Sequence, residues 1–88
     1  MKILVAEPIS PAGVEKLAAT PGWNVVQADP KTYQEHLADC EALIVRSAVK
    51  VNRELIRNAP KLRVVGRAGV GVDNVDLPAA TNAGILVM

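Results

Sequence analysis

Short apolar runs recur along this chain, and a segment with the start and stop signals of a helix separates each run from the next. The runs are rich in Val, Ile and Leu, which is typical of inner strands that are buried on both faces of a parallel sheet. We expect strands at residues 3–6, 23–28, 42–45, 62–65 and 85–88.

Helix signals fill the intervals between the runs. Ser, Asn and Asp are good N-terminal caps, and Pro fits the first turn of a helix. Caps of this kind, two of them with a nearby Pro, are Ser10, Asn52 and Asp76. Pro or Gly residues that stop a helix follow at Pro21–Gly22, Pro60 and Gly84. A further helix is expected to open at Asp29–Pro30 and to run through Tyr33, His36 and Leu37.

The alternation of strand and helix predicts a single α/β domain over residues 1–88. Strands joined through helices favour a parallel sheet with right-handed crossovers and helices on both faces. Five strands with this spacing indicate the flavodoxin-like order 2-1-3-4-5. Ligands of such sheets bind beyond the carboxyl ends of the strands, so function is expected near residues 7–10, 46–47 and 67–71.

Two arginines end neighbouring strands of this predicted sheet. Arg46 follows the run at 42–45, and Arg67 follows the next run. A pair of permanently charged guanidinium groups suits a phosphate or a carboxylate. The glycine loop Gly69-Val70-Gly71 can expose backbone N–H groups that bind anionic oxygens. Alternatively, each arginine is a solvated strand end or pairs with a carboxylate, and the loop is a tight turn without a ligand.

Several other kinds of site are excluded by the sequence. The loop matches only two glycines of a dinucleotide-binding G-x-G-x-x-G, because Asn74 takes the third place. A phosphoacceptor domain needs an Asp where Arg46 stands, and a flavodoxin needs a Ser/Thr/Gly loop after the first strand. His36 lacks any metal-ligand spacing, and Cys40 lacks a catalytic motif, so neither is expected to act in catalysis. No metal site is expected.

Charge and cysteine content restrict the setting. Ten Lys and Arg residues against nine Asp and Glu residues leave a net charge of +1, which argues against a nucleic-acid partner. One cysteine allows no intrachain disulfide and favours a reducing compartment. The apolar run at 3–6 is too short for a signal peptide or a membrane span, so we expect a cytoplasmic protein without a membrane partner.

Longer stretches of the sequence carry a resemblance to a known family. Residues 43–48, 62–76, 79–81 and 84–88 closely resemble the N-terminal part of the NAD-dependent D-2-hydroxyacid dehydrogenases. The similarity is greatest to the members that oxidise 3-phospho-D-glycerate in serine biosynthesis. It covers essentially the whole chain, and the stretch from Gly66 to Asp76 is its most specific part.

The resemblance implies a role for individual residues. It implies that Arg46, Ser47 and Arg67 lie near the anionic groups of a phosphorylated 2-hydroxy acid. It also implies that backbone N–H groups around Gly69, Val70 and Gly71 hold the carboxylate. The residue that matches Val70 borders the nicotinamide end of NAD, and since some relatives have Thr there, only a backbone contact is inferred for the valine.

The resemblance further implies that this chain is one piece of a larger enzyme. The catalytic His, its Glu partner, the catalytic Arg and the NAD-binding glycines of the family would all lie beyond Met88. We therefore expect the N-terminal part of a substrate-binding domain, without the dinucleotide-binding domain, inactive by itself and belonging to a homo-oligomer. The sheet should lack one covering helix, which the family supplies from a returning C-terminal segment. The alternative is a self-contained binding or interaction module without catalysis.

Overall fold

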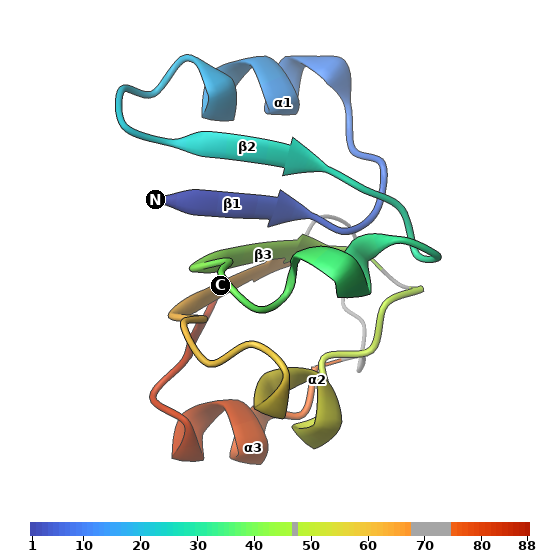
Figure 1. The fold of residues 1–88 in the computed structure, drawn as a ribbon, viewed down its shortest axis with the longest axis vertical. Coiled ribbons are helices and arrows are strands. Elements are labelled where there is room, and N and C mark those ends of the chain that lie inside the picture. The colour runs from blue at the N-terminus through green and yellow to red at the C-terminus, as the bar shows by residue number, and fades with distance from the viewer. Residues whose placement is uncertain (47, 68–74) are drawn as a thin grey trace.

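The computed structural model of the chain describes residues 1–46, 48–67 and 75–88. Its strands form one parallel sheet in the order β2-β1-β3-β4-β5, which confirms the predicted strand order (Figure 1). The strands are β1 (Lys2–Val5), β2 (Asn24–Gln27), β3 (Ala42–Val45), β4 (Val64–Arg67) and β5 (Leu86–Val87). The helices are α1 (Pro11–Ala18), the 3-10 helix η1 (Tyr33–His36), α2 (Arg53–Arg57) and α3 (Leu77–Asn82).

The helices α1, α2 and α3 begin at the predicted caps. The side chains of Ser10, Asn52 and Asp76 each accept a hydrogen bond from the backbone N–H three residues further on, at 3.3, 2.9 and 3.0 Å. These bonds satisfy donors that the first turn of a helix leaves without a partner. Gly84 ends the turn after α3 with a φ of 75°, a left-handed conformation that glycine adopts without strain.

The predicted second helix is wrong in length and type. The chain from Asp29 forms a turn in which its Oδ1 accepts hydrogen bonds from the N–H groups of Lys31 and Thr32, at 2.8 and 3.0 Å. An Asp side chain that bonds to its own backbone competes with an α-helix in this way. Only the short η1 follows.

The fourth strand begins later than the residues 62–65 that the apolar run predicted. Leu62 is 6% exposed and packs in the core, but its N–H donates to the carbonyl of Ala59 at 3.1 Å, within a turn. A buried side chain does not by itself distinguish a strand from the turn that leads into it. The strand at 64–67 carries Arg67 as its last residue.

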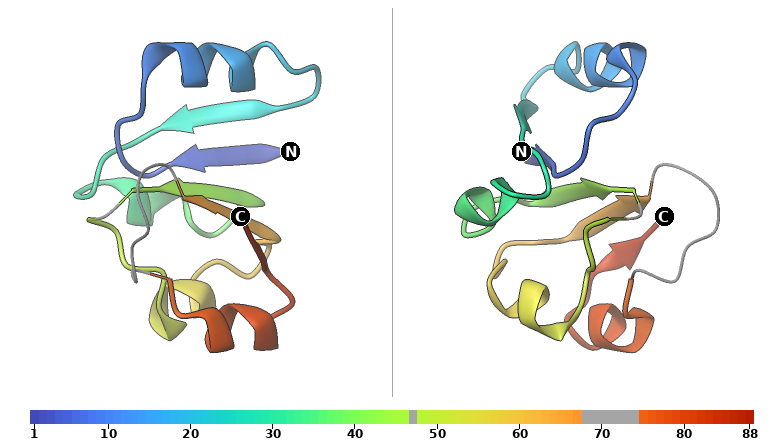
Figure 2. Two further views of the ribbon diagram at one scale, coloured as in Figure 1. Left: turned by 180° about the vertical axis from the view of Figure 1, so that it is seen from behind. Right: turned by 90° about the vertical axis from the view of Figure 1, so that its right-hand side faces the viewer.

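Helices cover the two faces of the sheet unequally. The right-hand view of Figure 2 shows α1 on one side of the sheet, and η1, α2 and α3 on the other. The main core lies under these last three elements, where the register aligns Leu4 with Leu43 and Leu43 with Val65, all three fully buried. Helices on both faces are therefore confirmed.

The opposite face loses its cover from β1 towards β5. Its aligned residues are Ile3, Ala42, Val64 and Leu86, one from each of four strands. Ile3 is 2% exposed and Ala42 is 7% exposed, whereas Val64 is half-buried and Leu86 is 62% exposed. This gradient agrees with the expected gap in the helical cover, and it lies where β5 forms the edge of the sheet.

Candidate functional site

The carboxyl edge of the sheet brings the two predicted arginines to adjacent strands. Val45, the last residue of β3, is the register partner of Arg67, the last residue of β4. Arg46 follows Val45 directly, so it lies one position beyond Arg67 on the neighbouring strand. Both arginines are exposed. Arg46 lies just past the end of β3 and Arg67 ends β4, so the two arginines share the carboxyl edge of the sheet.

Arg46 is held at both of its ends by the segment that follows β1. Its backbone N–H donates a hydrogen bond to Oε2 of Glu7 at 2.6 Å. Its Nη1 donates to the carbonyl oxygen of Pro8 at 3.3 Å. These contacts join two of the three segments in which the sequence predicted function.

Glu7 is the buried charged residue of the part of the chain that the structure describes, with 5% of its surface exposed. Besides the bond from Arg46, its Oε2 accepts from the N–H of Val49 at 3.1 Å, and its Oε1 accepts from the N–H of Ala48 at 3.0 Å. Burial raises the pKa of this carboxyl, but the hydrogen bonds from the three N–H groups and the charge of Arg46 outweigh it and hold the pKa below its ordinary value. Glu7 is therefore a buried carboxylate at neutral pH.

Four other predicted site residues lie outside the described residues. They are Ser47, Gly69, Val70 and Gly71. Their place in an anion site stays a prediction. The structure thus brings Arg46 and Arg67 to one edge, and adds Glu7, which lies in the segment 7–10 but was not among the predicted site residues.

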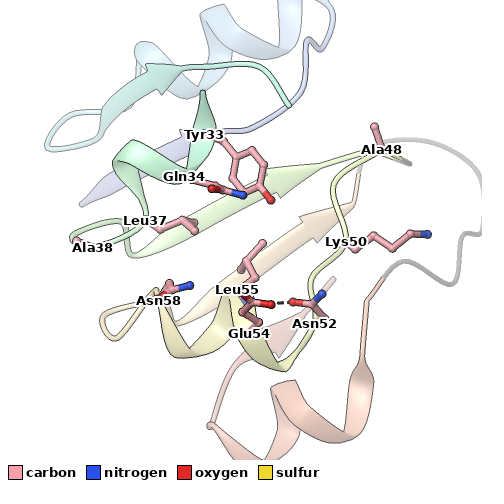
Figure 3. Close-up of a pocket in the computed structure, with 10 residues that line it drawn as sticks. All are labelled: Tyr33, Gln34, Leu37, Ala38, Ala48, Lys50, Asn52, Glu54, Leu55 and Asn58. Carbon is pink, nitrogen blue, oxygen red and sulfur yellow. Dashed lines mark hydrogen bonds between the residues drawn. The ribbon is translucent and has the colours of Figure 1, made fainter. Parts of the chain in front are cut away.

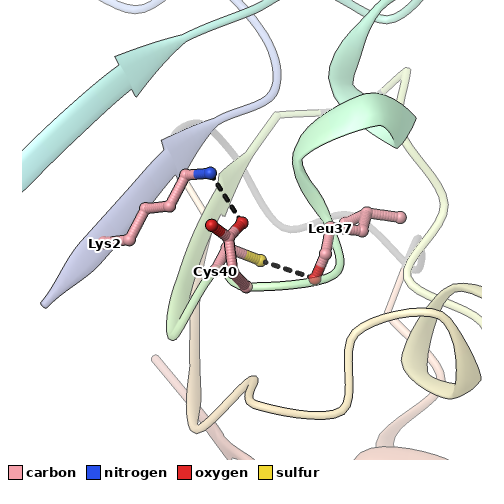
Figure 4. Close-up of polar contacts among 4 residues, drawn as sticks. Lys2, Leu37 and Cys40 are labelled. Carbon is pink, nitrogen blue, oxygen red and sulfur yellow. Dashed lines mark hydrogen bonds and ion pairs between the residues drawn. The ribbon is translucent and has the colours of Figure 1, made fainter.

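The surroundings of Cys40 indicate a structural role and not a reactive one (Figure 4). Its side chain is fully buried, and its Sγ donates to the carbonyl oxygen of Leu37 at 3.6 Å. Burial raises the pKa of this thiol, which disfavours the reactive thiolate. The nearby charges belong to an ion pair between Lys2 and Asp39, with 2.6 Å between Nζ and Oδ1.

Other kinds of site find no support in the described part of the chain. No group of three or more His, Cys, Asp or Glu residues there could hold a metal ion. His36 ends η1 and is half-buried. Among the same residues, no helix has the length and apolar character needed to cross a membrane.

A pocket of about 560 Å³ lies between η1 and α2 (Figure 3). Polar side chains contribute much of its lining, and the Asn52 amide among them already caps α2 through Leu55. The lining residues are Tyr33, Gln34, Leu37, Ala38, Ala48, Lys50, Asn52, Glu54, Leu55 and Asn58. We assign no role to this pocket.

The strand order and the all-parallel register define a flavodoxin-like α/β domain. The family profile for the catalytic domain of D-isomer specific 2-hydroxyacid dehydrogenases matches residues 3–88. This chain belongs to that family.

Known proteins agree with this assignment in sequence and in structure. The chain is 50% identical over 90 residues to D-3-phosphoglycerate dehydrogenase of Homo sapiens, and 43% identical over 89 residues to that of Methanocaldococcus jannaschii. It superimposes on the NAD-bound 3-phosphoglycerate dehydrogenase of Entamoeba histolytica with a TM-score of 0.85 and 32% identity, over all of this chain. An NAD-dependent formate dehydrogenase from Staphylococcus aureus also matches, with a TM-score of 0.82 and 28% identity over 99% of this chain.

The matches cover almost all of this chain but a small part of each relative. The chain spans 17% of the length of the human and archaeal dehydrogenases. It spans 32% and 30% of the two solved structures. What those proteins bind and catalyse therefore reaches this chain only as a proposal.

Proposed function

We propose that residues 1–88 are the N-terminal part of the substrate-binding domain of an NAD-dependent D-3-phosphoglycerate dehydrogenase. The enzyme oxidises 3-phospho-D-glycerate to 3-phosphohydroxypyruvate, and this segment binds the anionic groups of the substrate. The catalytic residues and the dinucleotide-binding domain lie outside the chain. The proposed enzyme is a cytoplasmic homo-oligomer.

The observation that carries this proposal is the register of β3 and β4, which brings Arg46 and Arg67 to one edge of the sheet. The identity to D-3-phosphoglycerate dehydrogenases over 99–100% of the chain supports the choice of substrate. A substrate with both a carboxylate and a phosphate suits two cationic side chains better than a simple 2-hydroxy acid does.

The two arginines act in binding and orientation. Because both arginines lie at the carboxyl edge of the sheet, each can contact an anion that lies beyond the strand ends. Ser47 and the backbone N–H groups around Gly69, Val70 and Gly71 add neutral donors to the same site. A guanidinium group carries its charge at any physiological pH, so substrate binding needs no proton transfer from these residues.

The residues of this chain do not fit a complete NAD site. The pyrophosphate of a dinucleotide sits on a glycine loop at a helix N-terminus, and the loop at 69–74 has Asn74 in place of the third glycine. NAD, when bound, supplies the hydride acceptor. In this proposal the absent domain holds NAD, and this chain contributes the backbone of Val70 near the nicotinamide.

Steady-state kinetics of the full-length enzyme test the proposal. We expect Arg46→Ala and Arg67→Ala each to weaken substrate binding by about 1.5–3 kcal/mol, the worth of one charge-assisted contact. The Michaelis constant for 3-phosphoglycerate should rise accordingly, by about tenfold or more.

Arg57→Ala is the matched control. Arg57 is an exposed arginine at the last position of α2, and the chain from there leads to the amino end of β4, at the opposite edge of the sheet. The Arg57→Ala variant loses the same charge as the two site variants and should leave KM unchanged. An unchanged KM and kcat/KM in both Arg46→Ala and Arg67→Ala would refute the assignment of the site.

A further inference from the structure

We propose that Glu7 is a positioning residue of the substrate site: its buried carboxylate fixes the backbone of Arg46, Ala48 and Val49 and so aims the Arg46 guanidinium at the substrate. The inference deepens the proposed function and rests on it. Glu7 does not itself contact the substrate in this proposal. It acts through Arg46.

The first support is where the donors to Glu7 come from. Its two oxygens accept hydrogen bonds from the backbone N–H groups of Arg46, Ala48 and Val49, at 2.6, 3.0 and 3.1 Å. All three donors lie within four residues of the end of β3, and they are 39 to 42 residues from Glu7 in the sequence. A carboxylate that accepts from three N–H groups fixes the backbone at the three residues that donate them.

The second support is the hold on Arg46 itself. Its backbone N–H bonds to Glu7 and its Nη1 bonds to the carbonyl of Pro8, the very next residue. The backbone and the end of the side chain of Arg46 are thus both hydrogen-bonded to the same short stretch after β1. Arginine has many rotamers, and fixing both ends reduces the conformational entropy that binding must remove.

The third support is the chemistry of the group. Burying a carboxylate costs free energy unless the group is well hydrogen-bonded. A neutral side chain at this position would fill the core with a smaller desolvation cost. Glu7 offers two acceptor oxygens to three donors, a demand that a single amide oxygen cannot meet. Its negative charge is also attracted to the cationic side chain of Arg46.

The test is a double-mutant cycle in the full-length enzyme with Glu7→Gln, Arg46→Ala and the double variant. We expect Glu7→Gln to raise KM for 3-phosphoglycerate about tenfold, which corresponds to one weakened charge-assisted contact. In the Arg46→Ala background, the same change should raise KM less than twofold, because the residue through which Glu7 acts is gone. A merely structural role would give the same factor in both backgrounds.

Glu15→Gln on the exposed surface of α1 removes the same charge and serves as the control. Circular dichroism establishes that each variant is folded at the assay temperature. If Glu7→Gln is not folded, Glu7→Asp takes its place, since it keeps the charge but withdraws both oxygens by one methylene. The same non-additive rise in KM is then expected.

The outcomes separate this inference from the proposed function. If Arg46→Ala raises KM but the folded Glu7 variant does not, or if the two effects add, Glu7 is not a positioning residue. If the wild-type enzyme does not oxidise 3-phosphoglycerate, or if the arginine variants bind it normally, the proposed function fails and the inference fails with it.

Discussion

Replacing Glu7 by Gln should make the stability of the chain less dependent on pH. The folded structure holds the pKa of Glu7 below its ordinary value. Such a carboxyl contributes stability above the pKa that it has in the unfolded chain, and this contribution is lost as the pH falls through the lower pKa of the folded state. The loss begins below pH 4.5, the ordinary pKa of this group.

The size of the effect at neutral pH follows from the geometry. A Gln in the same place satisfies Arg46 and Val49 best by placing its one oxygen where Oε2 now stands. Its amide NH2 then faces the N–H of Ala48, and two donors meet. One N–H without a partner costs about 1–3 kcal/mol. The free energy of unfolding of Glu7→Gln should therefore be lower than that of the wild type by about 1–3 kcal/mol at pH 7.

Urea unfolding followed by circular dichroism at pH 7 and pH 3 measures the difference between the two proteins. We expect the gap of about 1–3 kcal/mol to shrink at pH 3, because Glu7 is then mostly protonated in the unfolded chain, and folding must either remove that proton or bury it among the N–H donors. Asp29 and Asp39, whose pKa values are lowered as well, are present in both proteins and cancel in the difference. A gap of equal size at both pH values, or no gap at pH 7, would contradict the bonding described for Glu7.

Two further predictions concern binding and association. Calorimetric titration of the 88-residue chain with NAD should show no micromolar binding, since Asn74 breaks the glycine pattern that a dinucleotide needs; micromolar affinity would refute this. The chain should self-associate through its uncovered sheet face, and Leu86→Lys should weaken this association in sedimentation equilibrium while shifting the free energy of unfolding by no more than about 0.5 kcal/mol, as is usual for exposed positions. A wild-type chain that stays monomeric at high concentration, without binding a hydrophobic dye, would show that the face is not adhesive.

Local signals in the sequence predicted most of the fold. The caps Ser10, Asn52 and Asp76 act within three residues of themselves, so the sequence alone locates their helices. The apolar runs likewise predicted each strand to within a few residues. The signal failed at Asp29, where turn bonding by the side chain prevailed over helix formation.

Long-range bonding limited what could be predicted of the site. Arg46 and Arg67 follow apolar runs, so their place at one edge could be inferred from the alternation of strands and helices. Glu7 follows an apolar run too, but its partners are backbone N–H groups about 40 residues away. Every residue except proline carries the same backbone N–H group, so no residue pattern predicts which of these groups a distant carboxylate will bind. An acidic residue directly between a buried strand and a proline was the available signal.

The hydrogen bonds of Glu7 form late in synthesis, because their donors are made after Glu7 itself. β1 is made first but lies inside the sheet, between β2 and β3. Val49 leaves the ribosome 42 residues after Glu7, roughly two to eight seconds later at ordinary elongation rates of about 5–20 residues per second. Until then the Glu7 carboxylate stays hydrated and charged, and the first strand has no partner on the β3 side. The nascent chain therefore positions the backbone of Arg46 in the same step in which it removes the charge of Glu7 from water. Glu7 is the buried charged residue among those that the structure describes.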